Sequence, residues 1–538
     1  MRMKKLLALY LVVTFLLSGC FYAGIFDMAG GSGISSAEDM VYTRPDPEEF
    51  RELVEDACET VEEADSFDEV AKVVLEVDSA YGEFVTNYHL SNIRYSADLT
   101  DTHWEEEYNF CSQSVPALDQ AMERLYRTLA RCPYREDLET DAYFGEDFFD
   151  DYDGELLYDD HFVGLTEKEA SLENRYYDLC DQSESEDSNY GTDLAEEMAE
   201  LLVELVALRQ EIAAYAGYES FAHYTYDTYY GRDYTPKQAE EYLIALGQTM
   251  TPVLIDFYLM DDWGISFEHC DEQTALDYVR ASADAMGGKI SEAFEFMESH
   301  SLYDIAYSPN KYNASFEVFL PSYVVPFIFM NPSLSQGDKL TLAHEFGHFA
   351  NDYACNGSYA GIDVAEVHSQ AFEYMSLCYG PADQSLINYK LINSLLLNMQ
   401  CSANALFELQ LYQLTGEDLT VENVVDLYER ITEQFGCDVW GMDGYAFVQT
   451  THFYTSPMYM VSYVVSNDQA LQIYQKELEK SGAGLKLYQK CLQSNESRII
   501  HFAQEYGLES PFEKGRAQAM EEFYDKFFQK LSAYEPAA

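Results

Sequence analysis

The segment from residue 340 to residue 348 decides the fold and the chemistry, and it reads Leu340-Thr341-Leu342-Ala343-His344-Glu345-Phe346-Gly347-His348. His344 and His348 are four residues apart, so on a helix both imidazoles leave the same face and can bind one Zn²⁺ ion. Glu345 projects beside them and can take a proton from water. The apolar flanking residues predict a buried helix rather than two surface histidines. Buried histidines beside a glutamate need a charge partner, which a dication supplies.

A third ligand for this ion is predicted in the segment from Val364 to Glu373. Glu366 is the favoured ligand, and Glu373 lies seven residues on, two helical turns along the same face, where its carboxylate can orient a ligand histidine. His368 is the rival ligand, but on a helix it faces elsewhere than Glu366. The third histidine of the metzincin pattern is absent, because Ala354 stands in its place. We therefore expect one zinc ion per chain.

Most of the chain has the pattern of helices. Asp46-Pro47 predicts a capped helix start, Thr235-Pro236-Lys237-Gln238 has the form of a capping box, and a helix from about Thr192 is expected to stop at Gly217. The best strand candidate is Phe316–Met330, where Pro321 and Pro326 favour the edge of a sheet or a bulge rather than its interior. The predicted fold class is mainly α with a small β-sheet.

A segment far downstream resembles a known family. His452-Phe453-Tyr454-Thr455-Ser456-Pro457-Met458-Tyr459-Met460-Val461-Ser462-Tyr463 is similar to the His-Phe-x-x-x-Pro-Phe-Tyr-x-x-x-Tyr stretch of oligoendopeptidase F-like enzymes, in the thimet oligopeptidase family of zinc metallopeptidases. Weaker matches follow the family's order at Arg209–Tyr218, Tyr323–Asn331 and Ser510–Phe512. The resemblance covers about 200–530 well and 46–190 only in helical character.

The resemblance implies an ellipsoidal, almost entirely helical metallopeptidase with a deep substrate channel and zinc at its floor. The small β-sheet would lie beside the zinc helix, and its edge strand around Val324–Phe329 would pair with an extended peptide. His452, Tyr459 and Tyr463 would stabilise the oxyanion. Ser456-Pro457 predicts that a helix begins there, with both tyrosines on one face. The loop between His348 and Glu366 is several residues shorter than is usual in the family, which puts its substrate contacts in doubt.

The chain is strongly acidic. It has 538 residues, 96 Asp and Glu against 31 Lys and Arg, and a formal net charge of −65. Such a chain repels phosphate backbones, so we expect no nucleic-acid partner. The acidity is typical of a solvated surface, and the alternative interpretation is a preference for cationic substrates. We expect a monomer.

The N-terminus has the features of an export signal. Arg2, Lys4 and Lys5 precede the apolar stretch Leu6–Leu17, which is too short to span a bilayer. Leu17-Ser18-Gly19-Cys20 resembles the lipobox of bacterial lipoproteins, which implies cleavage before Cys20 and lipidation of its thiol. The alternative is a plain secretory signal with an incidental cysteine.

The predicted organisation is a lipoprotein signal peptide at 1–19 and a lipid-anchored flexible linker at 20–45. An N-terminal helical region at 46–190 and a zinc peptidase region at 191–538 follow. The predicted function is an extracytoplasmic, membrane-anchored zinc endopeptidase that hydrolyses short unstructured peptides. The alternatives are an exopeptidase of similar zinc chemistry and a lipoprotein that captures peptides without cleaving them. Glu345 argues against the second, because binding alone needs no base beside the metal.

Overall fold

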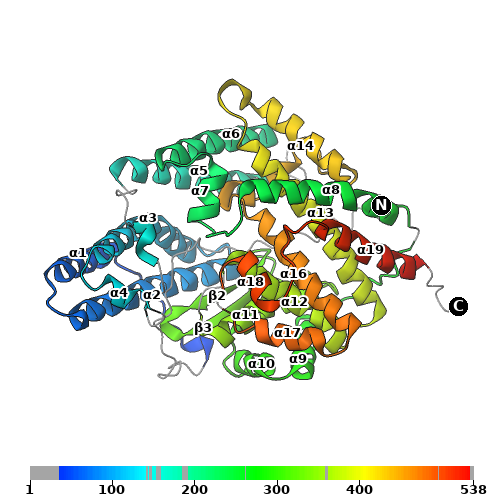
Figure 1. The fold of residues 1–538 in the computed structure, drawn as a ribbon, viewed down its shortest axis with the longest axis horizontal. Helices are drawn as coiled ribbons and strands as arrows, with labels where there is room; N and C mark the ends of the chain where they lie inside the picture. The colour runs from blue at the N-terminus through cyan, green and yellow to red at the C-terminus, as the bar shows by residue number, and fades with distance from the viewer. Residues whose placement is uncertain are drawn as a thin grey trace.

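The computed structural model describes residues 36–140, 143–144, 148–152, 159–184, 192–260, 262–357, 361–494 and 496–532. It is mainly helical with one small sheet, as predicted (Figure 1). The predicted signal peptide, the lipidation site Cys20 and the linker up to residue 35 lie outside the described residues. Among the described helices, none combines the length and the apolar character that a membrane span requires.

The first helices form one end of the molecule around a hydrophobic core of their own (Figure 1). Asp46 caps the start of the first helix as predicted. Its carboxylate accepts hydrogen bonds from the amides of Glu48 and Glu49, and Pro47 is the first helical residue. The elements here are α1 (Pro47–Glu63), α2 (Phe67–Ala97), α3 (Thr102–Ala130), α4 (Arg135–Leu138) and η5 (Phe148–Tyr152). The short turn η4 (Ala37–Asp39) precedes them and packs against the larger core, where the amide of Ala37 donates to the carbonyl of His300.

Part of the segment that the sequence assigns to a flexible linker is bound to this N-terminal end. The Tyr42 hydroxyl donates to Glu107 at 2.6 Å, and the amide of Thr43 donates to Asn87 at 2.8 Å. Met40 is buried, and its carbonyl accepts from Arg94 at 2.9 Å. Residues 40–43 are therefore packed on the folded protein.

The remaining helices share a second, larger core. Two predicted boundaries are confirmed: Thr235 and Gln238 form a capping box at the start of α8, and Gly217 follows α6 with a φ of 84°. These helices are α5 (Asp160–Glu184), α6 (Thr192–Tyr215), α7 (Phe221–Thr228), α8 (Pro236–Tyr258), α9 (Glu272–Met286), α10 (Lys289–Ser299), α11 (Asp338–Cys355), α12 (Ile362–Tyr379), α13 (Gln384–Leu411), α14 (Val421–Phe435), α15 (His452–Thr455), α16 (Met460–Glu479), α17 (Ala483–Cys491), α18 (Ile499–Tyr506) and α19 (Arg516–Ser532). Short 3₁₀ turns lie at η6 (Pro321–Tyr323), η7 (Gly416–Asp418), η8 (Asp438–Trp440) and η9 (Ala446–Gln449).

The sheet has three short strands in the order β1-β3-β2, namely β1 (Tyr303–Asp304), β3 (Val325–Met330) and β2 (Ser315–Leu320). β3 is antiparallel to β2 and parallel to β1. The sequence predicts an edge position or a bulge at Pro326, whereas β3 is the central strand. The amide of Ile328 points toward β1 and donates to the carbonyl of Leu302. The nitrogen of Pro326, two residues earlier, points to the same side, but β1 begins only opposite Ile328. Proline is therefore tolerated there, because no strand needs a hydrogen bond from its nitrogen.

Three helices and the sheet are arranged so that chemistry-bearing residues meet. α12 packs against both α11 and α16, and β2 and β3 pack against α11 (Figure 1). The segment with the two histidines therefore lies between the sheet on one side and α12 on the other.

Candidate metal centre and active site

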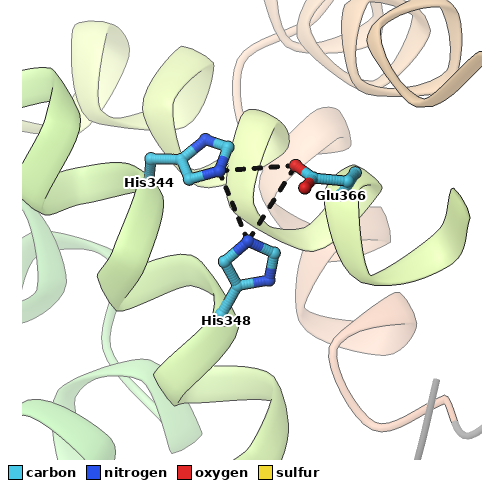
Figure 2. Close-up of side chains that lie close together, drawn as sticks. All are labelled: His344, His348 and Glu366. Carbon is cyan, nitrogen blue, oxygen red and sulfur yellow. Dashed lines mark hydrogen bonds and ion pairs between the residues drawn. The ribbon is translucent and has the colours of Figure 1, made fainter. Parts of the chain in front are cut away.

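Helix α11 brings His344 and His348 to one face, as their spacing predicts. Their Nε2 atoms are 3.3 Å apart and turn toward each other. Helix α12 places Glu366 opposite them, with its Oε2 atom 3.3 Å from Nε2 of His344 and 3.9 Å from Nε2 of His348. Figure 2 shows the three side chains pointing toward one point from the two neighbouring helices.

This triad is a donor set that fits a zinc ion. Among the described residues, it is the one group of three His, Cys, Asp or Glu side chains whose ligand atoms come together, all within 4.8 Å of one another. Burial lowers the pKa of His348 to about 4, so its imidazole is neutral and has a free lone pair. Two imidazole nitrogens and one carboxylate oxygen are the ligand types that zinc prefers, and three protein ligands leave a position open.

The two ligand-bearing helices are held in backbone contact at Gly347. A Cβ atom added to this glycine would lie 2.5 Å from the Cα atom of Ser369 on α12. The Ser369 hydroxyl donates to the Glu366 carboxylate at 3.2 Å. The close approach of α11 and α12 is what lets a glutamate of one helix reach the histidines of the other.

Glu373 occupies the orienting position that the sequence assigns to it. Its Oε1 atom lies 3.0 Å from Nδ1 of His344, which directs the Nε2 atom of that ring toward Glu366. The buried Lys390 of α13 donates to the other carboxylate oxygen at 2.7 Å. Lys390 is a residue of this network that the sequence pattern did not single out.

Glu345 is fully buried, and neither of its carboxylate oxygens makes a hydrogen bond. Burial raises its pKa to about 7, against the opposing effect of His344. A carboxylate without a fixed partner next to the triad is free to accept a proton from water at that point.

His452, Tyr459 and Tyr463 converge on the same site from the other side. The ring centroids of His452 and Tyr459 are 5.1 Å apart, as are those of Tyr459 and Tyr463. The Tyr459 hydroxyl donates to Oε1 of Glu366 at 2.9 Å. Both ring nitrogens of His452 are buried without a partner, which leaves them free for a ligand.

The local structure around these residues differs from the prediction. The sequence predicts a helix start at Ser456-Pro457, but Ser456 ends α15 and α16 begins at Met460. His452 lies on α15. Between the two helices Met458 adopts a φ of 65°. The two tyrosines remain neighbours because Tyr459 directly precedes α16 and Tyr463 lies one turn into it.

Two arginines with buried side chains hold this segment, and the sequence pattern assigned no role to either. Arg209 donates from Nη1 to the carbonyl of Phe453 at 2.8 Å. Arg232 donates from Nη2 to the carbonyl of Met458 and to the hydroxyl of Ser462, both at 2.9 Å. Arg209 lies in the Arg209–Tyr218 stretch that resembles the family, and this resemblance could have pointed to a role for it. Arg232 follows a tyrosine-rich stretch and had no such signal.

Two further contacts bind the turn at Met458. The Tyr230 hydroxyl donates to the carbonyl of Pro457 at 2.7 Å, and the Met458 amide donates to the buried Glu408 at 2.9 Å. The backbone before Tyr459 is therefore fixed by side chains from α6, from α13 and from the residues that follow α7.

His368, the rival ligand, lies away from the triad. Its ring is fully buried, neither nitrogen has a partner, and it packs edge-on against Phe502 of α18 with centroids 5.9 Å apart. It therefore does not share a point with His344 and His348.

Two models of one protein family match the chain. The peptidase M3 N-terminal domain matches residues 37–156, and peptidase family M3 matches residues 288–521. The second match contains the triad, Glu345 and the segment from His452 to Tyr463. No curated protein matches the sequence.

Solved structures share the fold. A protein described as an oligoendopeptidase F has a TM-score of 0.80 at 19% identity, and PZ peptidase A with an inhibitor has a TM-score of 0.79 at 19% identity. A Bacillus anthracis protein also described as an oligoendopeptidase F has a TM-score of 0.77 at 20% identity. Each match covers 93% of this chain and 99% of the other. The helical architecture expected from the resemblance is confirmed.

Proposed function

We infer that this chain, which belongs to peptidase family M3, is a zinc-dependent endopeptidase that hydrolyses short unstructured peptides outside the cytoplasm. The observation that carries the inference is the convergence of His344, His348 and Glu366 beside a buried Glu345 whose carboxylate has no hydrogen-bond partner. His348 and Glu366 are buried, His344 is partly buried, and none of the three carries more than one charge, which suits a dication.

Zinc held by His344, His348 and Glu366 would supply a Lewis acid that polarises the scissile carbonyl and activates water. Glu345 would accept the proton of the attacking water and return it to the leaving amine. His452, Tyr459 and Tyr463 would donate hydrogen bonds to the developing oxyanion. Glu373 and Lys390 would hold His344 in the orientation that the site requires.

An endopeptidase acting on extended peptides is favoured over the two alternatives. The resemblance to oligoendopeptidase F-like enzymes favours internal cleavage over an exopeptidase, and a narrow channel would admit unfolded chains only. Glu345 disfavours a lipoprotein that only captures peptides, because its burial without a partner is costly and serves no purpose in binding alone.

The proposed location rests on the N-terminal sequence. The apolar stretch ending in Leu17-Ser18-Gly19-Cys20 supports export and attachment through lipidated Cys20. Two or three acyl chains suffice to hold a protein on a membrane that its own negative charge would avoid.

The function is tested with the purified full-length protein and an internally quenched peptide. We expect one zinc ion per chain by elemental analysis, internal cleavage by mass spectrometry of the products, loss of activity with a chelator and recovery with Zn²⁺. Products shortened by one residue from an end would instead establish the exopeptidase alternative. Binding of the peptide without cleavage would establish the capture alternative.

Three variants separate the roles of the site residues. Glu345→Gln should retain zinc and lose about 10²- to 10⁴-fold in turnover, because a positioned base is removed. Glu366→Ala should lose zinc, whereas His368→Ala should retain it. Glu422→Gln, an exposed acid on α14, is the control and should match the wild type in both measurements.

A further inference from the structure

Strand β2 presents a row of side chains to helix α11 next to the candidate site. Ser315, Glu317 and Phe319 share one face of the strand because successive strand residues alternate. Ser315 lies near the Glu345 carboxylate, and the Phe319 ring lies directly against Gly357, just past the end of α11. β2 therefore runs alongside α11 from Glu345 toward its C-terminal end, with Glu317 between these two contacts.

Glu317 faces two other carboxylates across this contact. It interacts electrostatically with Asp352 and with Glu345, and both of these lie on α11. Glu317 is buried, with 8% of its surface exposed, and its Oε1 atom has no hydrogen-bond partner. Asp352 is half-buried, so it is the least buried of the three acids. Burial and the two neighbouring acids raise the pKa of Glu317 well above its usual value.

The described part of the protein supplies no counter-charge. The ion pairs of the described lysines, arginines and histidines do not include Glu317 or Asp352, and the electrostatic neighbours of Glu317 are both acids. A buried carboxylate pair of this kind is costly unless it stays protonated or binds a cation. The lack of a cationic partner among the described residues points to one that arrives with a ligand.

The missing cation is not a second metal ion. Three ligand atoms that hold one ion must lie close together, and among the described residues only His344, His348 and Glu366 do so. Glu317, Glu345 and Asp352 are near enough to repel one another but too far apart to share an ion. An ammonium or guanidinium group differs from a metal ion, because a flexible side chain can bring its several N–H donors to two separated carboxylates. It would approach from the side of Asp352, the least buried of the three acids.

We propose that Glu317 and Asp352 form a subsite for a lysine or arginine side chain of the peptide substrate, next to the scissile bond. The position follows from Glu345, which would act at that bond and faces Glu317. The net charge of −65 would draw cationic peptides toward the protein, and this pair would select where the cationic residue lies.

The inference rests on the proposed peptidase function and is tested with matched peptides. One internally quenched peptide has only neutral residues near the cleaved bond. The other peptides of the series carry lysine, arginine, norleucine or citrulline at one position at a time. Norleucine matches the stem of lysine and citrulline matches the shape of arginine, but neither carries a charge. We expect kcat/KM for lysine and arginine to exceed that for norleucine and citrulline about 10-fold or more at one position, the scale of a charge-assisted hydrogen bond.

The preference is assigned to the pair by two variants and a salt series. Glu317→Gln and, at the half-exposed position where folding is less at risk, Asp352→Asn should each reduce the ratio of lysine to norleucine peptide toward one. Glu422→Gln should leave the ratio unchanged. The ratio should persist at about 0.5 M salt, because a buried pair is screened far less than surface charge.

The outcomes separate this inference from the proposed function. If no peptide is cleaved, the proposed function fails. If neutral and cationic peptides are cleaved equally well, the peptidase stands and the subsite is wrong, with Glu317 protonated in the working enzyme. A preference that survives both substitutions, or that disappears with salt, would also overturn the subsite, since it would then arise from the acidic surface.

Discussion

The hydroxyl of Tyr459 donates a hydrogen bond to Glu366, the proposed zinc ligand, and this contact gives the tyrosine two conceivable roles. It can donate to the oxyanion during turnover, or it can orient the glutamate. We expect Tyr459→Phe to lower kcat by about 10- to 10³-fold while KM stays within a few-fold and zinc content is unchanged, because an oxyanion donor acts on the transition state. Steady-state kinetics and elemental analysis measure the three quantities.

A matched control is Tyr488→Phe on α17. Its hydroxyl is also buried and donates to α12, at the carbonyl of His368, but it does not face the triad. This variant should lower the melting temperature and keep kcat. If Tyr459→Phe instead reduces zinc binding and its kcat recovers with excess Zn²⁺, the residue orients the ligand and donates nothing to the oxyanion.

Asp78 on α2 offers a pH-dependent test of the N-terminal end. Burial raises its pKa from 3.8 to about 6, so the folded state binds its proton more tightly than the unfolded state does. The stability that this group contributes is present below pH 4 and is lost as the pH rises through about 6. At pH 7.5 the buried charge is therefore a net cost.

We expect Asp78→Asn to increase the free energy of unfolding at pH 7.5 by about 1–2 kcal/mol, a value reduced for its partial exposure. Urea titrations should show no gain at pH 4, where the aspartic acid is already neutral. Glu76→Gln, an exposed acid on the same helix, should change stability little at either pH. If Asp78→Asn increases the free energy of unfolding equally at pH 4 and pH 7.5, burial of the charge is not the cause.

At the scale of elements, the turn between α15 and α16 is held by Arg232. Its guanidinium bonds Met458 and Ser462, lies 3.4 Å from the buried Asp363 and stacks on the rings of Tyr226 and Tyr230. A lysine keeps the charge but cannot make this fork of bonds. Arg232→Lys should therefore displace the backbone before Tyr459 without removing any group that touches substrate.

We expect Arg232→Lys to lower kcat by about 10-fold or more with zinc content and KM nearly unchanged, because misplaced catalytic groups cost rate more than binding. Kinetics are measured well below the melting temperature, since a weakened buried ion pair also destabilises. The matched comparison is Arg516→Lys, whose buried ion pair with Asp468 lies on α16 and α19. Equal loss of kcat in both variants would indicate general destabilisation rather than positioning.

Local sequence predicted the helices whose ends depend on local contacts. The cap at Asp46, the capping box at Thr235 and the stop at Gly217 each involve residues within a few positions of one another. The spacing of His344 and His348 placed both rings on one face for the same reason. The start predicted at Ser456-Pro457 was wrong because distant groups, Arg232 and Glu408, bond the backbone of Met458 and delay α16.

The central position of β3 was also beyond local reasoning. Proline at 326 is a sound edge signal, but it cannot show that β1 begins only opposite Ile328, two residues past the proline. Likewise, Lys390 is far along the chain from Glu373, and no periodicity links the two. The sequence pattern does not predict contacts between distant elements, because these depend on how whole helices and strands pack against one another.

For the whole molecule, we propose that membrane attachment through Cys20 is separable from peptide hydrolysis. We expect Cys20→Ala to release the protein from the membrane fraction or to block its maturation, because the acyl chains have no other thiol to occupy at the cleavage site. Fractionation and mass spectrometry of the N-terminus measure this. Membrane retention of an uncleaved Cys20→Ala chain would mean that the apolar stretch itself holds the protein there.

The contact of Gly347 with Ser369 bears on how such a site can evolve. The apolar residues of α11 can be exchanged for others of similar volume, because neighbouring side chains repack. Position 347 has no such freedom, since its neighbour is backbone, and even a methyl group would push α12 away and carry Glu366 out of reach of the histidines. Substitutions can therefore accumulate in most of this helix, whereas position 347 must remain glycine for the two helices to keep this contact.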